Sequence, residues 1–154
     1  MGRVRAQLLA AKSEASELRT VDAVIVLDTH AWLWLCLEPR QLSAAAAGAI
    51  RGAMKDGGLA IASMTLLEVA VMVARRRVVP QGMPENWLRT LIDRSGVIVK
   101  EITPAVATLA AHLPDDFPGD PADRLIAATA RAEGASLVTR DARIKASRVV
   151  ETIW

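Results

Sequence analysis

The sequence predicts an α/β protein in which helices flank a central, mostly parallel sheet of about four to five strands. From residue 23 onward, short apolar runs alternate with segments of helical periodicity, as in parallel sheets whose crossovers are helices. The run Val24-Ile25-Val26-Leu27 is apolar throughout, which is typical of a strand buried on both faces. With 154 residues, 52% of them hydrophobic, the chain can build one core.

The first part of the chain is divided by Pro and Gly residues. Pro39 ends the first helix, Ser43 is placed to cap the second, and Gly57-Gly58 closes it. Pro80, Gly82 and Pro84 then separate two further helices. The expected elements are a strand at 24–27, helices at 29–37 and 43–54, a strand at 59–62, helices at 64–77 and around 87–92, and a strand at 97–99.

The second part continues the alternation. Pro104 suits the first turn of a helix that runs through 111, and two prolines and a glycine make 114–119 a loop. Asp120-Pro121 opens a helix through 132, a strand follows at 136–139, and 149–150 is a candidate fifth strand. Residues 1–22 are interpreted as an N-terminal extension, and 23–154 as one domain.

Composition and charge restrict the function. A net charge of +2 is a weak field unless clustered, and 3% aromatic residues with no Tyr disfavour a strand binder that stacks many bases. The single Cys36 excludes an internal disulfide framework. The longest apolar stretch, 24–37, carries Asp28 and His30 and is shorter than the roughly 20 residues that span a bilayer. We therefore expect a cytoplasmic protein with no membrane association.

Four acidic residues follow strands or begin the helices after them. They are Asp28, Glu68, Asp123 and Asp141. In a parallel sheet these places share one edge, where open α/β folds bind ligands. The four carboxylates are therefore expected to meet in one cleft.

Each acid also has a purely structural interpretation. Thr65-Leu66-Leu67-Glu68 has the spacing of a capping box, in which Glu68 reaches back to the Thr65 backbone. Asp120 suits an N-cap and Asp123 the first turn of the same helix. Asp141 could cap a short helix over 142–146. Asp28 is the hardest to explain this way, because a carboxylate beside an apolar strand is costly to bury.

Together the acids favour a metal site. Clustered carboxylates repel one another unless a cation neutralises them, and a set of oxygen ligands favours Mg²⁺ or Mn²⁺ over Zn²⁺. Such an ion activates water and stabilises charge on a phosphodiester. The chain has no G-x-S-x-G, P-loop or G-x-G-x-x-G motif, so serine hydrolase, nucleotide triphosphatase and dinucleotide-binding functions lack their signatures.

The sequence resembles the PIN-domain family, and within it the VapC-type toxins of bacterial toxin–antitoxin systems. The resemblance covers about residue 24 to the C-terminus and depends on four segments in the family's order. They are Ile25-Val26-Leu27-Asp28-Thr29-His30-Ala31-Trp32-Leu33-Trp34, Thr65-Leu66-Leu67-Glu68-Val69, Asp120-Pro121-Ala122-Asp123-Arg124-Leu125-Ile126-Ala127-Ala128-Thr129-Ala130 and Leu137-Val138-Thr139-Arg140-Asp141.

This resemblance implies a three-layer Rossmann-like fold and a Mg²⁺- or Mn²⁺-dependent endoribonuclease. It matches Asp28, Glu68 and Asp123 to the family's core acids, Asp141 to a more variable fourth acid, and Asp120 to an additional one. All five are the expected metal ligands, and all but Asp120 the expected catalytic residues. Thr29 and Thr139 match small polar residues that orient carboxylates or water.

Several expectations concern partners. Phosphate contacts are expected from Arg124, Arg140, Arg143 and Lys145. Trp32 and Trp34 cannot share a helix face, so one is expected in the core and the other at a surface, which the resemblance implies is a dimer or antitoxin surface. The resemblance further implies an RNA substrate, a VapB-like antitoxin and a homodimer. The alternative is a catalytically inactive PIN-like module that binds a protein partner or RNA, with acids that only cap helices.

Overall fold

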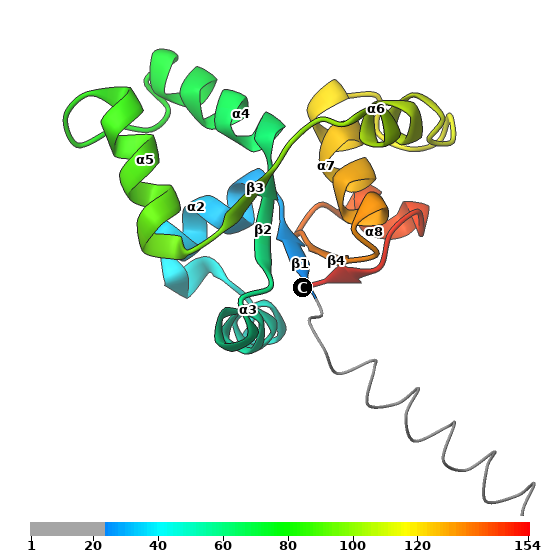
Figure 1. The fold of residues 1–154 in the computed structure, drawn as a ribbon, viewed down its shortest axis with the longest axis horizontal. Coiled ribbons are helices and arrows are strands. Elements are labelled where there is room, and N and C mark those ends of the chain that lie inside the picture. The colour runs from blue at the N-terminus through cyan, green and yellow to red at the C-terminus, as the bar shows by residue number, and fades with distance from the viewer. Residues whose placement is uncertain (1–23) are drawn as a thin grey trace, which may run out of the picture.

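A five-stranded sheet forms the centre of the computed structural model, which describes residues 24–154 (Figure 1). The strand order is β3-β2-β1-β4-β5, and each pairing is parallel. The predicted α/β class and parallel sheet are confirmed, whereas the extension predicted at 1–22 lies outside the described residues. The strands are β1 (Ile25–Leu27), β2 (Leu59–Ala62), β3 (Ile98–Lys100), β4 (Ser136–Val138) and β5 (Thr152–Ile153).

Helices cover both faces of the sheet, which gives the three layers that the resemblance implied. Figure 1 shows α2 and α5 on one side of the strands and α6, α7 and α8 on the other. No helix within residues 24–154 has the length and apolar character to cross a membrane. The helices are α2 (Thr29–Leu37), the 3₁₀ turn η1 (Pro39–Gln41), α3 (Ala44–Asp56), α4 (Ser63–Ala74), α5 (Pro84–Ser95), α6 (Pro104–Ala111), α7 (Pro121–Ala132) and α8 (Ala142–Ser147).

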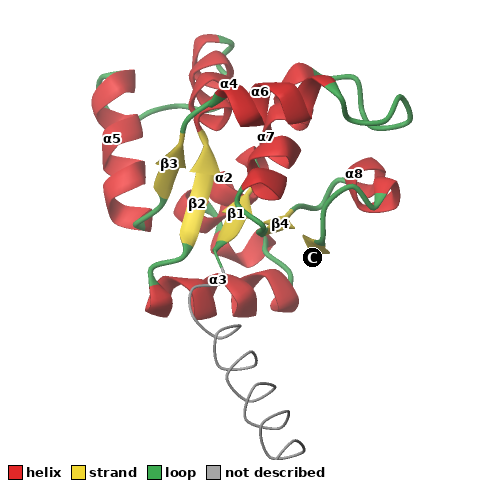
Figure 2. Ribbon diagram, turned by 45° about the vertical axis from the view of Figure 1, so that its right-hand side comes forward, coloured by secondary structure: helices red, strands yellow, loops and turns green. Residues whose placement is uncertain are grey.

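Alternation along β1 divides the core between the two faces. Ile25 and Leu27 pack with α2, α3 and α5, whereas Val26 packs with α7 and α8. Both halves are filled by side chains that exclude water, such as Trp32 on one face and Phe117 on the other. Figure 2 shows the strands enclosed by helices in this way. Burial on both faces explains why β1 reads as a continuous apolar run.

Capping residues and glycines set the helix ends largely as predicted. Ser43 Oγ accepts a hydrogen bond from the Ala46 backbone N–H at 3.1 Å, and Gly57 ends α3 with φ of 71°, a conformation that glycine adopts without a Cβ penalty. Asp120 caps α7 through the Ala122 N–H at 2.8 Å. The helix predicted over 64–77 is shorter at its end, because α4 stops at Ala74 and Arg76 takes a φ of 56°.

The fifth strand was predicted at the wrong residues. It is Thr152–Ile153, and its pairing with β4 is fixed by hydrogen bonds from Leu137 N to Glu151 O at 2.8 Å and from Thr139 N to Ile153 O at 3.2 Å. Val150, which the prediction placed in the strand, is buried against the α7 face of the core. Its β-branched side chain therefore serves packing and not the sheet ladder.

Successive strands are added on one side of β1 and then on the other. The crossovers after β1 lead to β2 and then β3, whereas β4 pairs with the opposite edge of β1. Asp28, directly after β1, donates its backbone N–H to Val138 O at 3.0 Å, so the carboxyl ends of β1 and β4 are tied together. Such a reversal leaves a crevice beyond the strand ends.

Candidate active site

A cleft of about 430 Å³ lies beyond the carboxyl ends of the strands. It brings together the acids that the sequence placed at strand ends and helix starts, with aromatic and basic side chains around them. The lining residues are Asp28, Thr29, His30, Trp34, Glu68, Asp120, Asp123, Ile126, Arg140, Asp141, Arg143 and Ile144. Five carboxylates from four chain segments therefore surround one space.

Asp28 is held by the start of α2. Its Oδ1 accepts the Ala31 backbone N–H at 2.7 Å, which makes Asp28 the N-cap of that helix. Burial raises the pKa of the Asp28 carboxyl, while hydrogen bonds from Thr139 and Ala31 act in the opposite direction. A cap alone needs no such burial, because N-caps work at the surface. The position therefore carries a desolvation cost that capping does not explain.

Thr139 connects two of the acids. Its side chain is buried and hydrogen-bonds to Asp28. Its Oγ1 also accepts the backbone N–H of Asp141 at 3.1 Å. The hydroxyl thus links the carboxylate after β1 to the chain after β4.

Glu68 is held by Thr29 and not by a capping box. The N-cap of α4 is Ala62, so Thr65 lies inside the helix and the predicted box is absent. Thr29 Oγ1 donates to Glu68 Oε2, and the Thr29 and Thr65 hydroxyl oxygens lie 3.2 Å apart. Because Thr29 has a single hydroxyl proton and gives it to Glu68, Thr65 is left to donate to Thr29. Both threonines are buried, so this chain of hydroxyls restricts where Glu68 can lie.

Asp123 is the acid most affected by its neighbours. Burial, followed by the negative charges of Asp120, Asp141 and Glu68, raises its pKa to about 6. Asp120 contributes through its position as the cap of α7, one turn before Asp123. The like charges around Asp123 show that the cluster is electrostatically unfavourable by itself, which is the condition that a cation relieves.

Arg143 supplies part of that compensation from within the chain. Its Nη2 lies 3.0 Å from Asp141 Oδ2 and 3.7 Å from Asp123 Oδ2. Asp141 also caps α8 by accepting the Arg143 backbone N–H at 2.8 Å, as predicted. The side-chain hydrogen bond from Arg143 lowers the pKa of Asp141. One guanidinium therefore neutralises the carboxylates that begin α8 and α7.

The donor set suits a hard divalent cation, although the side chains are not arranged around one. Oxygen ligands from carboxylates are what Mg²⁺ and Mn²⁺ prefer. Within residues 24–154, no three His, Cys, Asp or Glu side chains are grouped closely enough to hold an ion. Asp123 and Asp141 are engaged by Arg143 instead. Ligation would thus require Arg143 to release them and the carboxylates to turn inward.

The predicted basic residues occupy different places. Arg140 and Arg143 line the cleft, and Lys145 is exposed on α8 outside the lining. The Arg124 guanidinium donates to backbone carbonyl oxygens at the end of α6 and in the connection to α7, those of Ala110, Leu113, Pro114 and Phe117, at 3.3–3.5 Å. Arg124 thereby ties this connection to α7.

Two aromatic residues of the cleft were not among the predicted site residues. His30 and Trp34 lie one turn apart on α2, with ring centroids 5.8 Å apart. The sequence held a signal for them, since positions i and i+4 share a helix face and Asp28 immediately precedes the helix. Trp32, two residues before Trp34, is fully buried and donates its Nε1–H to Ser95 Oγ at 3.0 Å. The predicted split of the two tryptophans between core and surface is confirmed.

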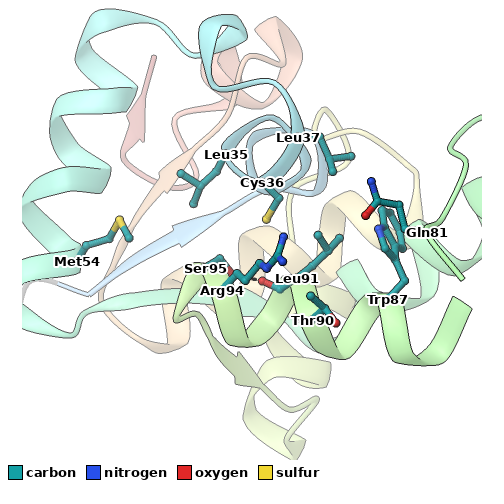
Figure 3. A pocket seen from close by; sticks show the side chains of 10 residues that line it. All are labelled: Leu35, Cys36, Leu37, Met54, Gln81, Trp87, Thr90, Leu91, Arg94 and Ser95. Atoms are coloured by element: carbon teal, nitrogen blue, oxygen red, sulfur yellow. Dashed lines mark hydrogen bonds between the residues drawn. The ribbon is translucent and has the colours of Figure 1, made fainter. Parts of the chain in front are cut away.

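A second cavity of about 600 Å³ lies between α2 and α5 (Figure 3). None of the described residues lining it is acidic; they are Leu35, Cys36, Leu37, Met54, Gln81, Trp87, Thr90, Leu91, Arg94 and Ser95. Burial raises the pKa of the Cys36 thiol to about 11, which keeps it protonated and weakly nucleophilic near neutral pH. Although larger, this cavity has no group suited to the chemistry of the acidic cleft.

Comparison with known proteins places the chain among relatives of one kind. A PIN domain family model matches residues 25–149. The chain is 39% identical over 132 residues to a protein of Mycobacterium tuberculosis named Ribonuclease VapC22, covering 84% of this chain and 98% of that relative.

Solved structures share the fold at lower sequence identity. A crystal structure of VapBC2 from Rickettsia felis bound to a promoter DNA fragment has a TM-score of 0.65 at 18% identity, covering 84% of this chain and 96% of the other. DNA-bound VapBC from Salmonella typhimurium gives a TM-score of 0.61 at 17% identity, with the same coverage. At these identities the structures establish the fold alone.

Proposed function

The chain belongs to the PIN-domain family, and from this we propose that it is a metal-dependent endoribonuclease, the toxin of a VapBC-like toxin–antitoxin pair. The similarity to a protein named Ribonuclease VapC22 over nearly its whole length supports this function. The observation that carries it is the convergence of five carboxylates from four segments on one cleft. We place the reaction in the cytoplasm, where the RNA of a bacterial cell is found.

We propose that Mg²⁺ or Mn²⁺ is held by Asp28 and Asp123, with Glu68, Asp141 and Asp120 completing the set of ligands and hydrogen-bond acceptors. When bound, such an ion lowers the pKa of water and stabilises the negative charge that develops on a phosphodiester during hydrolysis. The like charges that raise the pKa of Asp123 supply the attraction for a cation.

The remaining residues prepare the cleft for this reaction. Thr29, supported by Thr65, holds Glu68 in place, and Thr139 holds Asp28 relative to Asp141. Carboxylates held in this way need less reorganisation when charge develops, which helps a site to stabilise a transition state, whereas Asp123 and Asp141 must first leave Arg143. We assign Thr29 and Thr139 a positioning role and Asp28, Glu68, Asp123 and Asp141 the catalytic one.

Basic groups beside the acids would attract the RNA backbone. Arg140 and Arg143 line the cleft, and Lys145 is exposed on the neighbouring α8. Such groups neutralise phosphates without reading sequence. Phosphate contact by Arg124 stays a prediction, and its four carbonyl partners support an additional role in shaping the connection before α7.

We further propose a VapB-like antitoxin and a second copy of this chain as protein partners. Similarity to structures described as toxin–antitoxin complexes supports the antitoxin. Leu67 and Val71, one turn apart on α4, are 58% and 37% exposed and offer apolar surface for contact between copies. Measurement of the molecular mass in solution, with and without co-expressed antitoxin, tests both partners.

The function is tested by incubating the antitoxin-free protein with total RNA in Mg²⁺, in Mn²⁺ and in EDTA. Asp28→Asn keeps an equally good N-cap for α2 but loses the charge, so the variant should fold and cut no RNA. Asp93→Asn, an exposed change on α5 outside the cleft, is the matched control and should cut at the wild-type rate.

Cleavage that needs a metal and is lost in Asp28→Asn supports the nuclease, and mapped fragment ends give its cleavage site. Equal cleavage by Asp28→Asn contradicts the proposal. RNA left intact by a folded wild-type protein that binds Mn²⁺, or the absence of Mn²⁺ binding, favours the alternative of a module that only binds its partner.

A further inference from the structure

The wall of the cleft beside the acids is formed by an aromatic group on α2. His30 and Trp34 both line the cleft, and their rings lie 5.8 Å apart at an interplanar angle of 46°. His30 is exposed and Trp34 is partly exposed. Because Asp28 caps the same helix, these rings are held at a fixed position relative to the carboxylate.

Trp34 is supported from behind by the end of the chain. The Trp34 and Trp154 rings lie 5.5 Å apart at 52°, a separation at which aromatic pairs attract. Trp154 directly follows β5, which is hydrogen-bonded to β4. The indole that faces the cleft therefore packs against the residue that directly follows a strand of the sheet.

Arg140 adds a planar cation to the same wall. Its Cζ lies 5.9 Å from the centroid of the Trp34 ring, within the range of a cation–π contact. Arg140 is exposed and forms no ion pair among the described residues. In this it differs from Arg143, which is engaged by two carboxylates. A guanidinium near an aromatic ring and without an ion-pair partner is available to stack on a further planar group.

We propose that His30, Trp34 and Arg140 form a stacking platform that binds a nucleobase of the RNA strand beside the phosphodiester held at the acids. The inference rests on the proposed function and adds a base contact to it. Aromatic rings and guanidinium planes are the groups on which proteins stack unpaired bases. Bases within a duplex are already stacked on one another, so the platform selects an unpaired nucleotide at the cut site.

Simple packing does not account for this wall. The two tryptophans that serve the core, Trp32 and Trp87, are 0% and 6% exposed, whereas Trp34 keeps a surface in the cleft. A residue needed only to fill space beside Trp154 would gain nothing from a cationic neighbour and an exposed imidazole. The three side chains instead combine planarity with positive charge, which suits a base and its adjoining phosphate.

The test measures RNA binding without cleavage. In the Asp28→Asn background, fluorescence anisotropy at one low salt concentration compares two labelled strands of about 10 nucleotides, a length within the range that single-strand binding sites cover. One strand is oligoadenylate and the other is an abasic ribose–phosphate strand of equal length and charge. His30→Ala and Arg140→Lys should each weaken binding of oligoadenylate by about 5-fold or more and leave binding of the abasic strand unchanged.

Two further variants calibrate the measurement. Lys145→Gln removes an exposed cation that lies outside the platform. Because this cation attracts phosphates, its loss should lower the affinity for both strands by the same factor. Arg131→Gln, at the far end of α7, should leave the affinity for both strands unchanged. Circular dichroism and the melting temperature establish that each variant is folded, which His30→Ala and Arg140→Lys should be because both side chains are exposed.

Arg140→Gln could weaken the binding of both strands equally, with full recovery of both affinities in Arg140→Lys. That result would mean that Arg140 contacts phosphate alone and would overturn the platform. Unchanged oligoadenylate binding in His30→Ala and Arg140→Lys would overturn it as well. These outcomes differ from failure of the proposed function, which is seen as absent RNA cleavage by the wild-type protein. If Asp28→Asn binds neither strand, the platform is also wrong.

Discussion

The Thr29 hydroxyl donates a hydrogen bond to the Glu68 carboxylate, joining the first turn of α2 to α4 across 39 residues of sequence. Both ends of this contact face the acidic cleft, and the contact is supported from within the core by Thr65. It sets the position of an acid that no helix cap restrains. The cluster thus depends on buried hydroxyls as much as on the carboxylates themselves.

Replacing Thr29 by Val removes this hydrogen bond while keeping the shape of the side chain. Loss of a group that orients a metal ligand typically costs about 10- to 100-fold in metal affinity or activity, and we expect Thr29→Val to lose Mn²⁺ affinity in that range. Isothermal titration with Mn²⁺ measures it. Thr29→Ser restores the hydroxyl and should recover most of the affinity; failure of Ser to do so would contradict the positioning role.

The stability of the metal-free protein should depend on Asp123 between about pH 4 and 6. Burial and neighbouring charges raise the pKa of Asp123 from 3.8 to about 6, so in this interval the folded protein binds more protons than the unfolded chain. The contribution of this residue to the free energy of unfolding therefore falls as the pH rises through the interval.

The measurement is urea unfolding in EDTA at several pH values, comparing the wild type with Asp123→Asn. The variant should be the more stable protein above pH 6, where the wild-type carboxylate is charged, and this advantage should shrink on acidification. Asp93→Asn, on the exposed face of α5, controls for loss of a carboxylate elsewhere. A stability difference that does not change with pH would be inconsistent with the raised pKa of Asp123.

Arg143 should compete with the metal for the carboxylates. Its guanidinium contacts Asp141 and Asp123 but is largely exposed, so water screens both contacts and each is weak. We expect Arg143→Gln to bind Mn²⁺ up to about 5-fold more tightly than the wild type. Lys145→Gln makes the same change of charge on α8 without a carboxylate partner among the described residues and should leave the affinity unchanged. Weaker Mn²⁺ binding by Arg143→Gln would exclude competition.

The buried pair of Trp32 and Ser95 should matter for stability and not for activity. Ser95→Ala leaves the Trp32 Nε1–H, which donates to Ser95 Oγ at 3.0 Å, without an acceptor in the core. An unsatisfied buried donor costs about 1–3 kcal/mol, measurable by urea unfolding. Cleavage of RNA at a temperature where both proteins are folded should be equal, because neither residue lines the cleft. Thr90→Ala, exposed on the same helix, should change stability by less than about 0.5 kcal/mol.

Residues at the ends of apolar strands were the most predictable part of the site. Asp28 and Asp141 follow β1 and β4 closely, and parallel strands bring such positions to one edge whatever the intervening sequence. The cap positions of Asp120 and Asp141 could be predicted for a similar reason, because a cap is a contact between near neighbours in the sequence. Sequence patterns are enough to predict a contact when the two residues that make it are close together in the sequence.

Contacts between segments that are distant in the sequence could not be predicted from its patterns. The spacing of Thr65 and Glu68 fitted a capping box, which was the structural alternative for this acid, but α4 begins two residues before Thr65 and the carboxylate accepts from Thr29 instead. Trp154 packs on Trp34 only because β5 is placed beside β4. The error at Val149-Val150 has the same origin, since Val150 fills the core and the ladder is made by Thr152 and Ile153.

The reversal of strand order between β1 and β4 has a consequence for the timing of synthesis. Asp28 and Glu68 leave the ribosome early, whereas Asp123, Asp141 and β4 come from the last third of the chain, and β4 must insert beside β1 before the acids can meet. A nascent chain that stops before β4 can carry Asp28, Glu68 and Asp123 but lacks Asp141 and the strand that brings it beside β1, so the cleft is incomplete. An endoribonuclease built in this order completes its acidic cluster only after β4 and Asp141 have been synthesised and β4 has paired with β1.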